Sequence, residues 1–358
     1  MTLPYRKIVL TGGAGFVGSN LAILFKHLLP AAKVIALDNL YRRGSELALS
    51  RLKEAGVEFV HGDIRCKEDI EALGSFDLML ECSAEPSVRA GYGQDPSYLI
   101  HTNLLGTIHC LEAVRKVKAD LVFLSTSRVY SIHKLQELPL QIDGKRLMLK
   151  GTSAQEGWSE HGISTSFSLA GSRSLYGTTK LASELLLEEY GAMYGLNILI
   201  NRCGVIAGPW QMGKVDQGFV TLWVARHFFG GTLKYTGFGG HGHQVRDVLH
   251  IEDLYDLLVL QLEQLSKHRG KIYNVGGGLK NSTSLAELTD WCTRENKPIE
   301  IGSDPQSHPA DIPYYVTDNR EVTAAMGWLP RRTLENTLGD VQRWLSAHQQ
   351  TVKTVLQQ

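Results

Sequence analysis

The sequence predicts an α/β protein: a Rossmann-type, doubly wound parallel sheet joined to a smaller α/β lobe. Two observations support this. A glycine-rich turn at residues 11–18 connects a short apolar run to a helical stretch, and further apolar runs alternate with helical stretches over the first 130 residues. Such alternation is typical of parallel sheets, because a helix usually carries the chain from one parallel strand to the next.

Composition limits the classes of protein that fit. With 358 residues, of which 43% are hydrophobic and 21% charged, the chain can bury a large core in one or two joined lobes. Its 37 basic and 37 acidic residues give a formal net charge of zero, and no basic run stands out. We therefore expect neither nucleic acid nor a membrane as a partner.

The sequence also lacks the marks of a secreted or metal-binding protein. No segment reaches eighteen uninterrupted apolar residues, and residues 1–7 lack the apolar core of a signal peptide, so we expect a cytoplasmic protein. The five cysteines are scattered without C-x-x-C spacing, which argues against a disulfide framework and a zinc site. We expect no bound metal.

Three glycines, Gly12, Gly15 and Gly18, lie at G-x-x-G-x-x-G spacing directly after the apolar run 8–10. The first allows a tight turn, the second lets phosphate oxygens approach the backbone, and the third lets a helix pack closely on the sheet. The following helix points its amino-terminal N–H groups at such phosphates. The turn therefore predicts a site for a dinucleotide pyrophosphate, with contacts from Gly12, Gly15, Phe16, Val17 and Gly18.

A second apolar run at 34–37 ends in Asp38, twenty residues beyond the last glycine of the turn. An acid at this place accepts hydrogen bonds from an adenosine ribose, so we expect Asp38 and Asn39 to contact the cofactor. A carboxylate repels the additional 2′-phosphate of NADP, and NAD is therefore favoured. Arg42 and Arg43 keep NADP open as an alternative, since a nearby arginine can accommodate that phosphate.

Three further apolar runs, at 57–60, 77–84 and 120–127, predict more strands of the sheet. Ligands of doubly wound sheets lie beyond the carboxyl ends of the strands. The residues to inspect therefore follow each run: Asp63-Ile64, Ser83 to Arg89, and Ser125 to Arg128. The hydroxyl groups of Ser125 and Thr126 can hold a substrate oxygen at such a strand end.

The alternation breaks at 131–174, a stretch too long for an ordinary connection within a compact domain. Alternating leucine and isoleucine residues on either side of Asp143-Gly144 predict a hairpin at 138–149. Residues 150–164 are rich in glycine and serine and predict a loop. A lid over a binding site and a passive surface insertion are both compatible with this stretch.

The second half mixes helices with short strands. A long helix is expected from Tyr176, followed by a strand at 197–203. Further helices are expected at 219–229, 252–265, 285–295 and 334–347, and strands at 233–238, 244–250 and 271–277. We expect a dinucleotide-binding Rossmann domain at 1–200 with the insertion 131–174, a mainly substrate-binding lobe at 201–348 with segments that return to the sheet, and a tail at 349–358.

The pattern Y-x-x-x-K occurs at Tyr130/Lys134 and at Tyr176/Lys180. Only the second pair begins a predicted helix, where residues i and i+4 share one face with Cβ atoms about 5–6 Å apart. A phenol with a reference pKa of about 10 becomes a credible proton acceptor when an ammonium group and an oxidised nicotinamide ring favour its phenolate form. We therefore expect Tyr176 to transfer the proton, assisted by Lys180.

Seven motifs fall in the order of a known family: TGGAGFVG at 11–18, DNL at 38–40, HGDIR at 61–65, NLLGT at 103–107, STSRVY at 125–130, YGTTK at 176–180 and VRDVLHIEDL at 245–254. The chain resembles the extended short-chain dehydrogenase/reductases, in the group of nucleotide-sugar epimerases and dehydratases. The resemblance implies a nucleotide-sugar substrate and a tightly held NAD that removes a hydride from a sugar carbon and usually returns it within one cycle. We expect a homodimer.

The resemblance also implies roles for individual residues. Asp63 and Ile64 would bracket the adenine, and Asn103 would support the catalytic helix and the cofactor. Further cofactor contacts are expected from Ser83, Ala84, Ser125, Tyr176 and Lys180. The expected catalytic residues are Thr126, Tyr176 and Lys180.

Within this group, three stretches resemble the C2 epimerases of CDP-linked deoxyhexoses: Ser127-Arg128, Asp216-Gln217-Gly218, and HQVRDVLHIEDL at 243–254. The resemblance places Arg246 on the nucleotide pyrophosphate and Gln211 with the Asp216 loop around the sugar nucleotide. The expected substrate contacts are Arg89, Ser127, Arg128, Gln211, Asp216, Gln217 and Arg246. The chain departs from the common pattern at 81–85, where Glu-Cys-Ser-Ala-Glu replaces His-x-Ala-Ala, and at Val205, where many relatives carry a polar residue.

The residues after Thr126 distinguish the expected reaction. A dehydratase of the group carries an Asp-Glu pair there, because elimination of water needs an acid and a base. Ser127 and Arg128 cannot easily replace that pair, since arginine stays protonated and has no acceptor. We therefore expect NAD-dependent epimerisation through a transient ketone, and the resemblance implies that it acts at C2 of a CDP-linked deoxyhexose. Alternatives are a 4-epimerase, decarboxylase or dehydratase of the same family, a net oxidoreductase that releases NADH, and a non-catalytic dinucleotide-binding protein.

Overall fold

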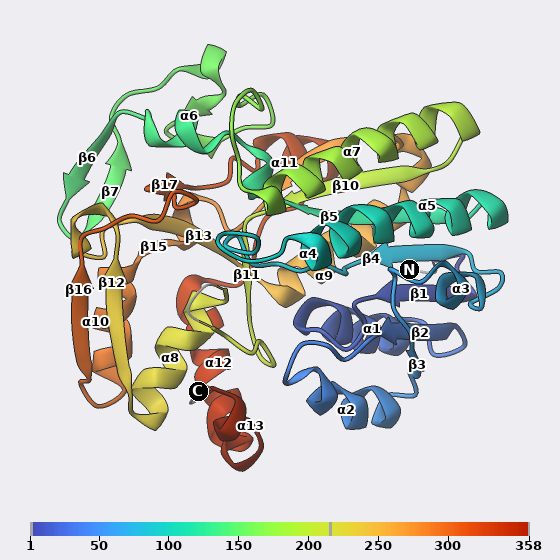
Figure 1. Ribbon diagram of the computed structural model, residues 1–358, viewed down its shortest axis with the longest axis horizontal. Coiled ribbons are helices and arrows are strands. Elements are labelled where there is room, and N and C mark those ends of the chain that lie inside the picture. The colour runs from blue at the N-terminus through green and yellow to red at the C-terminus, as the bar shows by residue number, and fades with distance from the viewer. Residues whose placement is uncertain (1–2, 215–216, 357–358) are drawn as a thin grey trace. The chain divides into compact units, whose positions relative to one another are not determined.

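Figure 1 shows the computed structural model, in which residues 3–214 and 217–356 are described. Contacts within the chain divide it into two compact units, each built from three segments. The first unit comprises Met1–Val129, Leu175–Arg202 and Tyr255–Tyr273, and the second comprises Tyr130–Ser174, Cys203–Leu254 and Asn274–Gln358.

Two segments group with a unit other than that of the residues on either side of them in the sequence. Residues 131–174 group with the second unit, in which the Ile163 amide donates to the Val316 carbonyl at 2.7 Å. Residues 255–273 group with the first, because helix α9 (Ile251–Glu263) packs Tyr255 edge-on against Phe25, with ring centroids 5.2 Å apart. Contacts between residues distant in the sequence, which the order of elements does not reveal, decide this division.

The first unit is built on a parallel sheet of seven strands, which confirms the predicted fold class. The strand order is β14 (Ile272–Val275), β10 (Ile198–Cys203), β5 (Asp120–Thr126), β4 (Leu78–Glu81), β1 (Lys7–Thr11), β2 (Lys33–Asp38) and β3 (Glu58–His61). The chain order reverses between β1 and β4, and doubly wound sheets bind ligands outside the carboxyl ends of their strands at such a point.

Helices cover both faces of this sheet (Figure 1). One face carries α1 (Phe16–Leu28) and α2 (Ala48–Glu54). The other carries α3 (Lys67–Glu71), α4 (Ser97–Ile100), α5 (Gly106–Val117) and α7 (Leu175–Tyr194). The predicted long helix after residue 175 is therefore present as α7.

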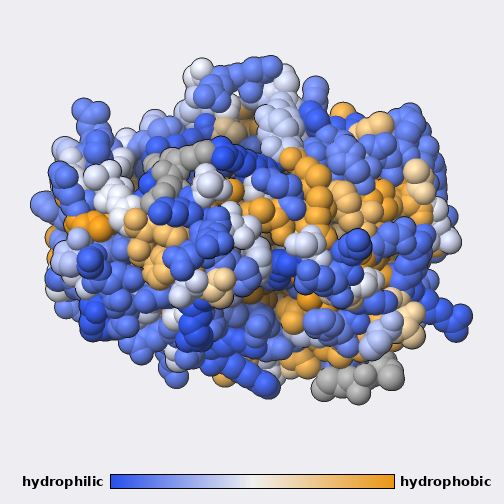
Figure 2. Space-filling model, turned by 90° about the horizontal axis from the view of Figure 1, so that it is seen from below, coloured by the Kyte–Doolittle hydropathy of each residue, from blue (hydrophilic) through white to orange (hydrophobic). Residues whose placement is uncertain are grey.

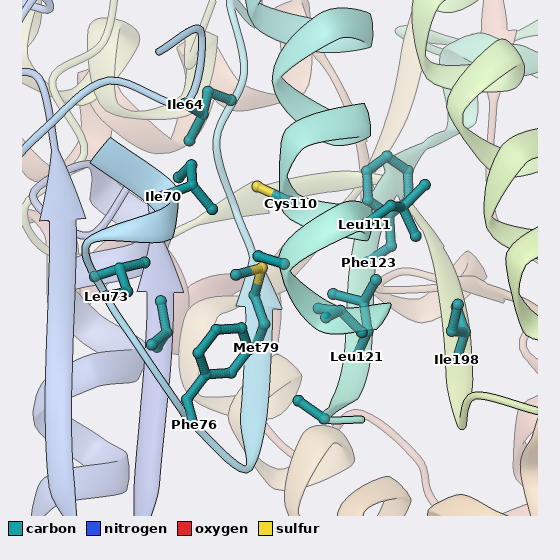
Figure 3. Close-up of a cluster of buried hydrophobic side chains, with 14 of the residues drawn as sticks. Ile64, Ile70, Leu73, Phe76, Met79, Cys110, Leu111, Leu121, Phe123 and Ile198 are labelled. Atoms are coloured by element: carbon teal, nitrogen blue, oxygen red, sulfur yellow. The ribbon is translucent and has the colours of Figure 1, made fainter. Parts of the chain in front are cut away.

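A buried hydrophobic cluster lies between the second face of the sheet and the helices that cover it. Met79 of β4 and Leu121 and Phe123 of β5 belong to it, together with Cys110 and Leu111 of α5, all of which are drawn in Figure 3. None of these five side chains is exposed. The packing fixes α5 over β4 and β5, the two strands whose carboxyl ends carry several of the predicted site residues.

The second unit contains smaller sheets. One joins β11 (Val205–Ala207), β13 (Val245–His250) and β15 (Ser282–Ser284), with β17 (Tyr314–Tyr315) also paired to β13, and another joins β12 (Thr232–Thr236) to β16 (Glu300–Asp304). Its helices are α6 (Ile132–Gln136), α8 (Phe219–Phe229), α10 (Leu285–Glu295), α11 (Arg320–Met326), α12 (Leu334–Ala347) and α13 (Gln349–Leu356). Three of them, α8, α10 and α12, begin and end at the predicted residues.

The insertion at 131–174 contains two hairpins. β6 (Leu140–Asp143) and β7 (Arg146–Leu149) form the predicted one, with Asp143 opposite Arg146. The stretch expected as a loop holds a second hairpin of β8 (Trp158–Ser159) and β9 (Gly162–Ile163). Trp158 and Ile163 are buried, although glycine and serine dominate the sequence around them.

Residues 349–356, expected as part of a tail, form helix α13. Val352 and Leu356, four residues apart on one helical face, are both buried. The other residues of α13 are mainly polar. Burial of its apolar face is therefore what stabilises this helix.

The surface in Figure 2 is mainly hydrophilic, with hydrophobic residues gathered among the polar ones. Within residues 3–214 and 217–356, no helix is long and apolar enough to span a membrane. The five cysteines are free thiols, and Cys110, Cys203 and Cys292 are buried.

Candidate active site

The glycine turn after β1 has little room for side chains. Gly12 has φ +63°, and a Cβ there would lie 3.0 Å from the Ser83 Cα. A Cβ on Gly18 would lie 2.1 Å from the Gly12 carbonyl oxygen, so the third glycine is needed for the close approach of α1. Gly13, for which the glycine spacing predicts no role, is equally constrained, because its Cβ would lie 2.5 Å from the Ala36 Cα.

Gly15 differs from the other glycines of the turn. Its Cβ would meet a single neighbour, the Gly12 carbonyl oxygen at 3.1 Å. Gly15 is also the N-cap of α1, whose first turn holds Phe16 and Val17. The open side at Gly15 and the amides at the start of α1 together suit a pyrophosphate.

Asp38 at the end of β2 is tied to the glycine turn. Its carboxylate accepts hydrogen bonds from the Ala14 amide at 3.0 Å and the Leu40 amide at 2.8 Å. Burial raises the pKa of this carboxyl, and bonds from the amides of Leu40, Ala14 and Gly15 oppose that shift. Asp38 therefore holds the turn against the second strand, at the edge where an adenosine ribose would lie.

Asn39 and Asp63 extend this edge to β3. The Asn39 amide group donates to the Asp63 carboxylate at 2.9 Å. Burial alone would raise the pKa of Asp63, but hydrogen bonds from Arg65 and Asn39 outweigh it and lower the pKa to about 2. The sequence-predicted ribose and adenine contacts, Asp38, Asn39 and Asp63, thus lie at neighbouring strand ends, with Ile64 buried directly after them.

This edge predicts that the protein prefers NAD to NADP. The Asp38 carboxylate would repel the 2′-phosphate of NADP, so cofactor-free protein should bind NAD at least about tenfold more tightly. Calorimetric titration with both dinucleotides measures the ratio, and Asp38→Asn should reduce it. Tighter binding of NADP would instead mean that Arg42 or Arg43 dominates the local field.

Helix α7 carries Tyr176 and Lys180 one turn apart. Both side chains are buried, with exposed fractions of 9% and 2%. The Lys180 ammonium lies 4.0 Å from the centroid of the Phe123 ring, a cation–π distance. This contact fixes the lysine over β5, the strand that ends in Ser125 and Thr126.

The two hydroxyl groups at the end of β5 have different partners. Ser125 donates its proton to the Glu184 carboxylate, which lies on α7. Thr126 accepts a hydrogen bond from the Arg128 amide at 3.2 Å, so its own proton stays available for a substrate oxygen. Of the pair, Thr126 is therefore better placed to hold the substrate.

Glu184 also forms a buried ion pair with Arg202 of β10, which was not predicted from the sequence. The shortest contact, from Arg202 Nη2 to Glu184 Oε2, is 2.7 Å, and the side chains are 5% and 1% exposed. One sequence signal exists: Glu184 lies four residues after Lys180 and eight after Tyr176, on the same helical face.

Asn103 lies in a π-helical turn, His101–Leu105, between α4 and α5. Its side chain accepts from the Glu85 amide at 2.8 Å and donates to the Glu85 carbonyl at 3.1 Å. Its main-chain carbonyl accepts from Ser183 of α7 at 3.0 Å. Asn103 thus connects the loop after β4, which contains Ser83 and Ala84, with α7.

In the other Y-x-x-x-K pair, Tyr130 is buried and Lys134 is exposed. Tyr130 is fully buried in the second unit, and its hydroxyl donates to Asn274 Oδ1 at 2.6 Å. Lys134 lies on the surface, where it pairs with Glu137 at 2.8 Å. Tyr130 and Lys134 therefore have separate partners.

The predicted substrate contacts come from both units. Arg89, Ser127 and Arg128 belong to the first. In the second, the Arg246 guanidinium donates to the Ile312 carbonyl at 2.6 Å, and Gln211 donates to the Ile206 carbonyl at 2.9 Å. Gln217 also belongs to the second unit, and Asp216 lies outside the described residues. Within the described chain, no group of three or more His, Cys, Asp or Glu residues is placed to hold a metal ion.

The first unit has the fold and the glycine turn of an NAD-binding enzyme. The chain belongs to the NAD dependent epimerase/dehydratase family, whose model matches residues 8–276. NAD is therefore its cofactor.

Among curated relatives, the chain is 31% identical to CDP-paratose 2-epimerase from Salmonella typhi, over 95% of this chain and 99% of that protein. It is 26% identical to dTDP-glucose 4,6-dehydratase from Streptomyces niveus, over 94% and 92% of the two chains.

Solved structures show the same fold. UDP-glucuronic acid 4-epimerase from Bacillus cereus, in complex with UDP-glucuronic acid and NAD, matches with a TM-score of 0.77 and 23% identity, covering 95% of this chain and 99% of that one. The dTDP-glucose 4,6-dehydratase DesIV from Streptomyces venezuelae, with NAD bound, matches with a TM-score of 0.76 and 25% identity, covering 98% and 99%.

Proposed function

We propose that this enzyme inverts C2 of a CDP-linked deoxyhexose through a transient ketone. The observation that carries the proposal is the pair of residues after Thr126, Ser127 and Arg128. The 31% identity to CDP-paratose 2-epimerase supports the same reaction and the same nucleotide.

Elimination of water, the dehydratase reaction, needs a proton donor and a proton acceptor beside the sugar. A guanidinium stays protonated and has no acceptor, so Arg128 cannot serve as the base. Epimerisation does not require this additional pair, because Tyr176 alone can take and return the proton of the sugar hydroxyl.

The residues of the first unit supply the remaining chemistry. Tyr176 takes the proton of the C2 hydroxyl, and the Lys180 ammonium on the same helical face favours the phenolate that accepts it. Thr126 donates a hydrogen bond to the same sugar oxygen. NAD, when bound, supplies a reversible hydride acceptor. The keto sugar would then turn over within the site, so that a hydride added to the other face of C2 would give the epimer, and Tyr176 would return the proton to the C2 oxygen.

The residues that we expect to contact the substrate are Arg89 and Arg128 in the first unit and Gln211 and Arg246 in the second. Of these, Arg246 suits the pyrophosphate of the nucleotide. We also propose a cytoplasmic homodimer. Leu185 and Met193 on α7, with exposed fractions of 58% and 68%, provide apolar surface for a second copy.

The substrate is tested by offering the purified protein CDP-, UDP-, GDP- and dTDP-linked sugars and following the products by NMR. We expect a C2 epimer from a CDP-linked deoxyhexose, with NAD retained on the protein. A C4 epimer or a decarboxylated sugar would keep the family and replace the reaction. NADH released in proportion to product would instead indicate a net oxidoreductase.

A further inference from the structure

A carboxyl group lies inside the hydrophobic cluster beneath α5 and α7. Glu81, the last residue of β4, is fully buried. In the parallel sheet it pairs in register with Thr11 of β1 and Phe123 of β5. Paired residues of neighbouring strands point to the same face, so Glu81 faces the cluster that includes Phe123 and Cys110 (Figure 3). The family pattern has a histidine at this position, and the sequence alone gave the glutamate no role.

The hydrogen bonds around Glu81 are best satisfied when it carries a proton. The Thr107 hydroxyl oxygen lies 2.5 Å from Glu81 Oε1 and 2.9 Å from the Asn103 carbonyl oxygen. A hydroxyl has one proton, and a carbonyl oxygen can only accept. If Glu81 is protonated, it donates to Thr107, and Thr107 donates to Asn103. If Glu81 is ionised, two acceptors compete for the single proton of Thr107.

The surroundings of the second carboxyl oxygen of Glu81 also favour the protonated state. Among the described residues, Glu81 Oε2 has no hydrogen-bond partner, and neither has the buried hydroxyl of its register neighbour Thr11. A buried carboxylate is stable only when its lone pairs are well satisfied, whereas a neutral carboxyl is much less costly to bury.

Two ionisable side chains, on helices that pack against the sheet, lie in the surroundings of Glu81 and matter for its charge state. Lys180 of α7, whose ammonium contacts Phe123, favours the ionised carboxylate. Cys110 of α5 remains a neutral thiol, because burial raises its pKa. Burial likewise raises the pKa of Glu81, and the opposing effects of Lys180 and Thr107 do not cancel that shift.

We propose that Glu81 is a positioning residue that keeps its proton in the folded enzyme at neutral pH and thereby leaves the charge of Lys180 to act on Tyr176. As a hydrogen-bond donor it also orients Thr107 toward the Asn103 carbonyl, which bonds to Ser183 on α7. A carboxylate at the same place would offset the Lys180 ammonium and weaken its effect on the phenolate. The catalytic part of this inference rests on the proposed role of Tyr176 and Lys180.

The protonation state can be measured without any turnover. Glu81→Gln is an isosteric neutral variant, and equilibrium unfolding of both full-length proteins is compared across pH. If the folded protein holds the proton, the folded-to-unfolded ratio of the wild type, relative to the variant, falls as pH rises above about 4.3, the unfolded value for Glu. The fall is up to about tenfold per pH unit until the pKa of the folded state is passed. A ratio that stays constant or rises with pH would overturn the proposal.

Glu112→Gln is the matched control in the same unit. Hydrogen bonding to Arg115 lowers the pKa of Glu112 to about 2, so its effect has the opposite sign. The stability that Glu112 contributes is present above its unfolded pKa and is lost as pH falls toward 2.

Infrared spectroscopy provides a second readout that does not depend on Glu81→Gln folding. A band of a protonated buried carboxyl should be present in the wild type at neutral pH and shift in Thr107→Val. Its absence from the wild type would contradict the proposal.

The pH dependence of turnover distinguishes the protonation state of Glu81 from the question of which reaction the enzyme catalyses. If Glu81 is neutral, the acid limb of the rate profile should stay at the same pH in Glu81→Gln. A limb that moves to lower pH would mean that the wild type carries a carboxylate there, and would overturn the inference while the epimerase stands. An enzyme without epimerase activity would overturn the proposed function, and the stability and infrared results would still decide the state of Glu81.

Discussion

Tyr176→Phe is expected to lower turnover at least about a hundredfold, the usual scale for loss of a general acid–base group, while NAD still binds. The phenol would accept the proton of the sugar hydroxyl, and phenylalanine keeps the packing of a side chain that is only 9% exposed. Steady-state turnover, together with the NAD absorbance of the purified variant, separates lost chemistry from lost cofactor.

Tyr130→Phe is the matched control, because it removes the same atom from the other Y-x-x-x-K pattern. The Tyr130 hydroxyl donates to Asn274 Oδ1 at 2.6 Å in a fully buried setting. Its loss should destabilise the fold by about 1–3 kcal/mol, the cost of an unsatisfied buried acceptor, and leave turnover per folded molecule near that of the wild type. Activity retained in Tyr176→Phe and lost in Tyr130→Phe would show that Tyr130, and not Tyr176, transfers the proton.

Glu184→Gln is expected to cause the largest loss of stability, about 3–5 kcal/mol in the free energy of unfolding. The variant leaves the Arg202 guanidinium, 5% exposed, without its buried counter-charge. It also changes the acceptor of the Ser125 hydroxyl at the end of β5. Chemical denaturation of the holoenzyme measures the loss.

Glu58→Gln removes an acid from an exposed ion pair in the same unit. Glu58 and Lys33 are 2.8 Å apart on neighbouring strands, with exposed fractions of 47% and 52%. Solvent screens such a pair, so this variant should lie within about 1 kcal/mol of the wild type. Equal losses in the two glutamate variants would mean that the buried pair has no special role.

Local patterns in the sequence predict much of the fold. The glycine turn, the apolar runs and the helices α8, α10 and α12 were all predicted, because each depends on a period or turn signal within one segment. Capping boxes at Ser284 and Thr333 start α10 and α12, which explains why those boundaries are well defined locally.

Other features depend on partners far away in the chain. Glu184 and Arg202 lie eighteen residues apart, and Glu81 and Thr107 twenty-six, so no local period indicates that either pair is buried together. Helix α13 escaped prediction because its two buried residues stand among polar ones. Tyr176 and Lys180 on α7 could be proposed from the sequence as the catalytic pair, because their spacing is that of one helical turn.

The fate of a deuterium label tests the proposed reaction most directly. CDP-linked deoxyhexose that carries deuterium at C2 is incubated with the enzyme, and the epimer is examined by NMR. Because the hydride is removed from C2 and returned to the opposite face of the same carbon, the epimer should keep its label at C2, with no dependence on added NAD if the cofactor stays bound. Loss of the label to solvent, or its appearance in released NADH, would contradict epimerisation through a transient ketone at C2.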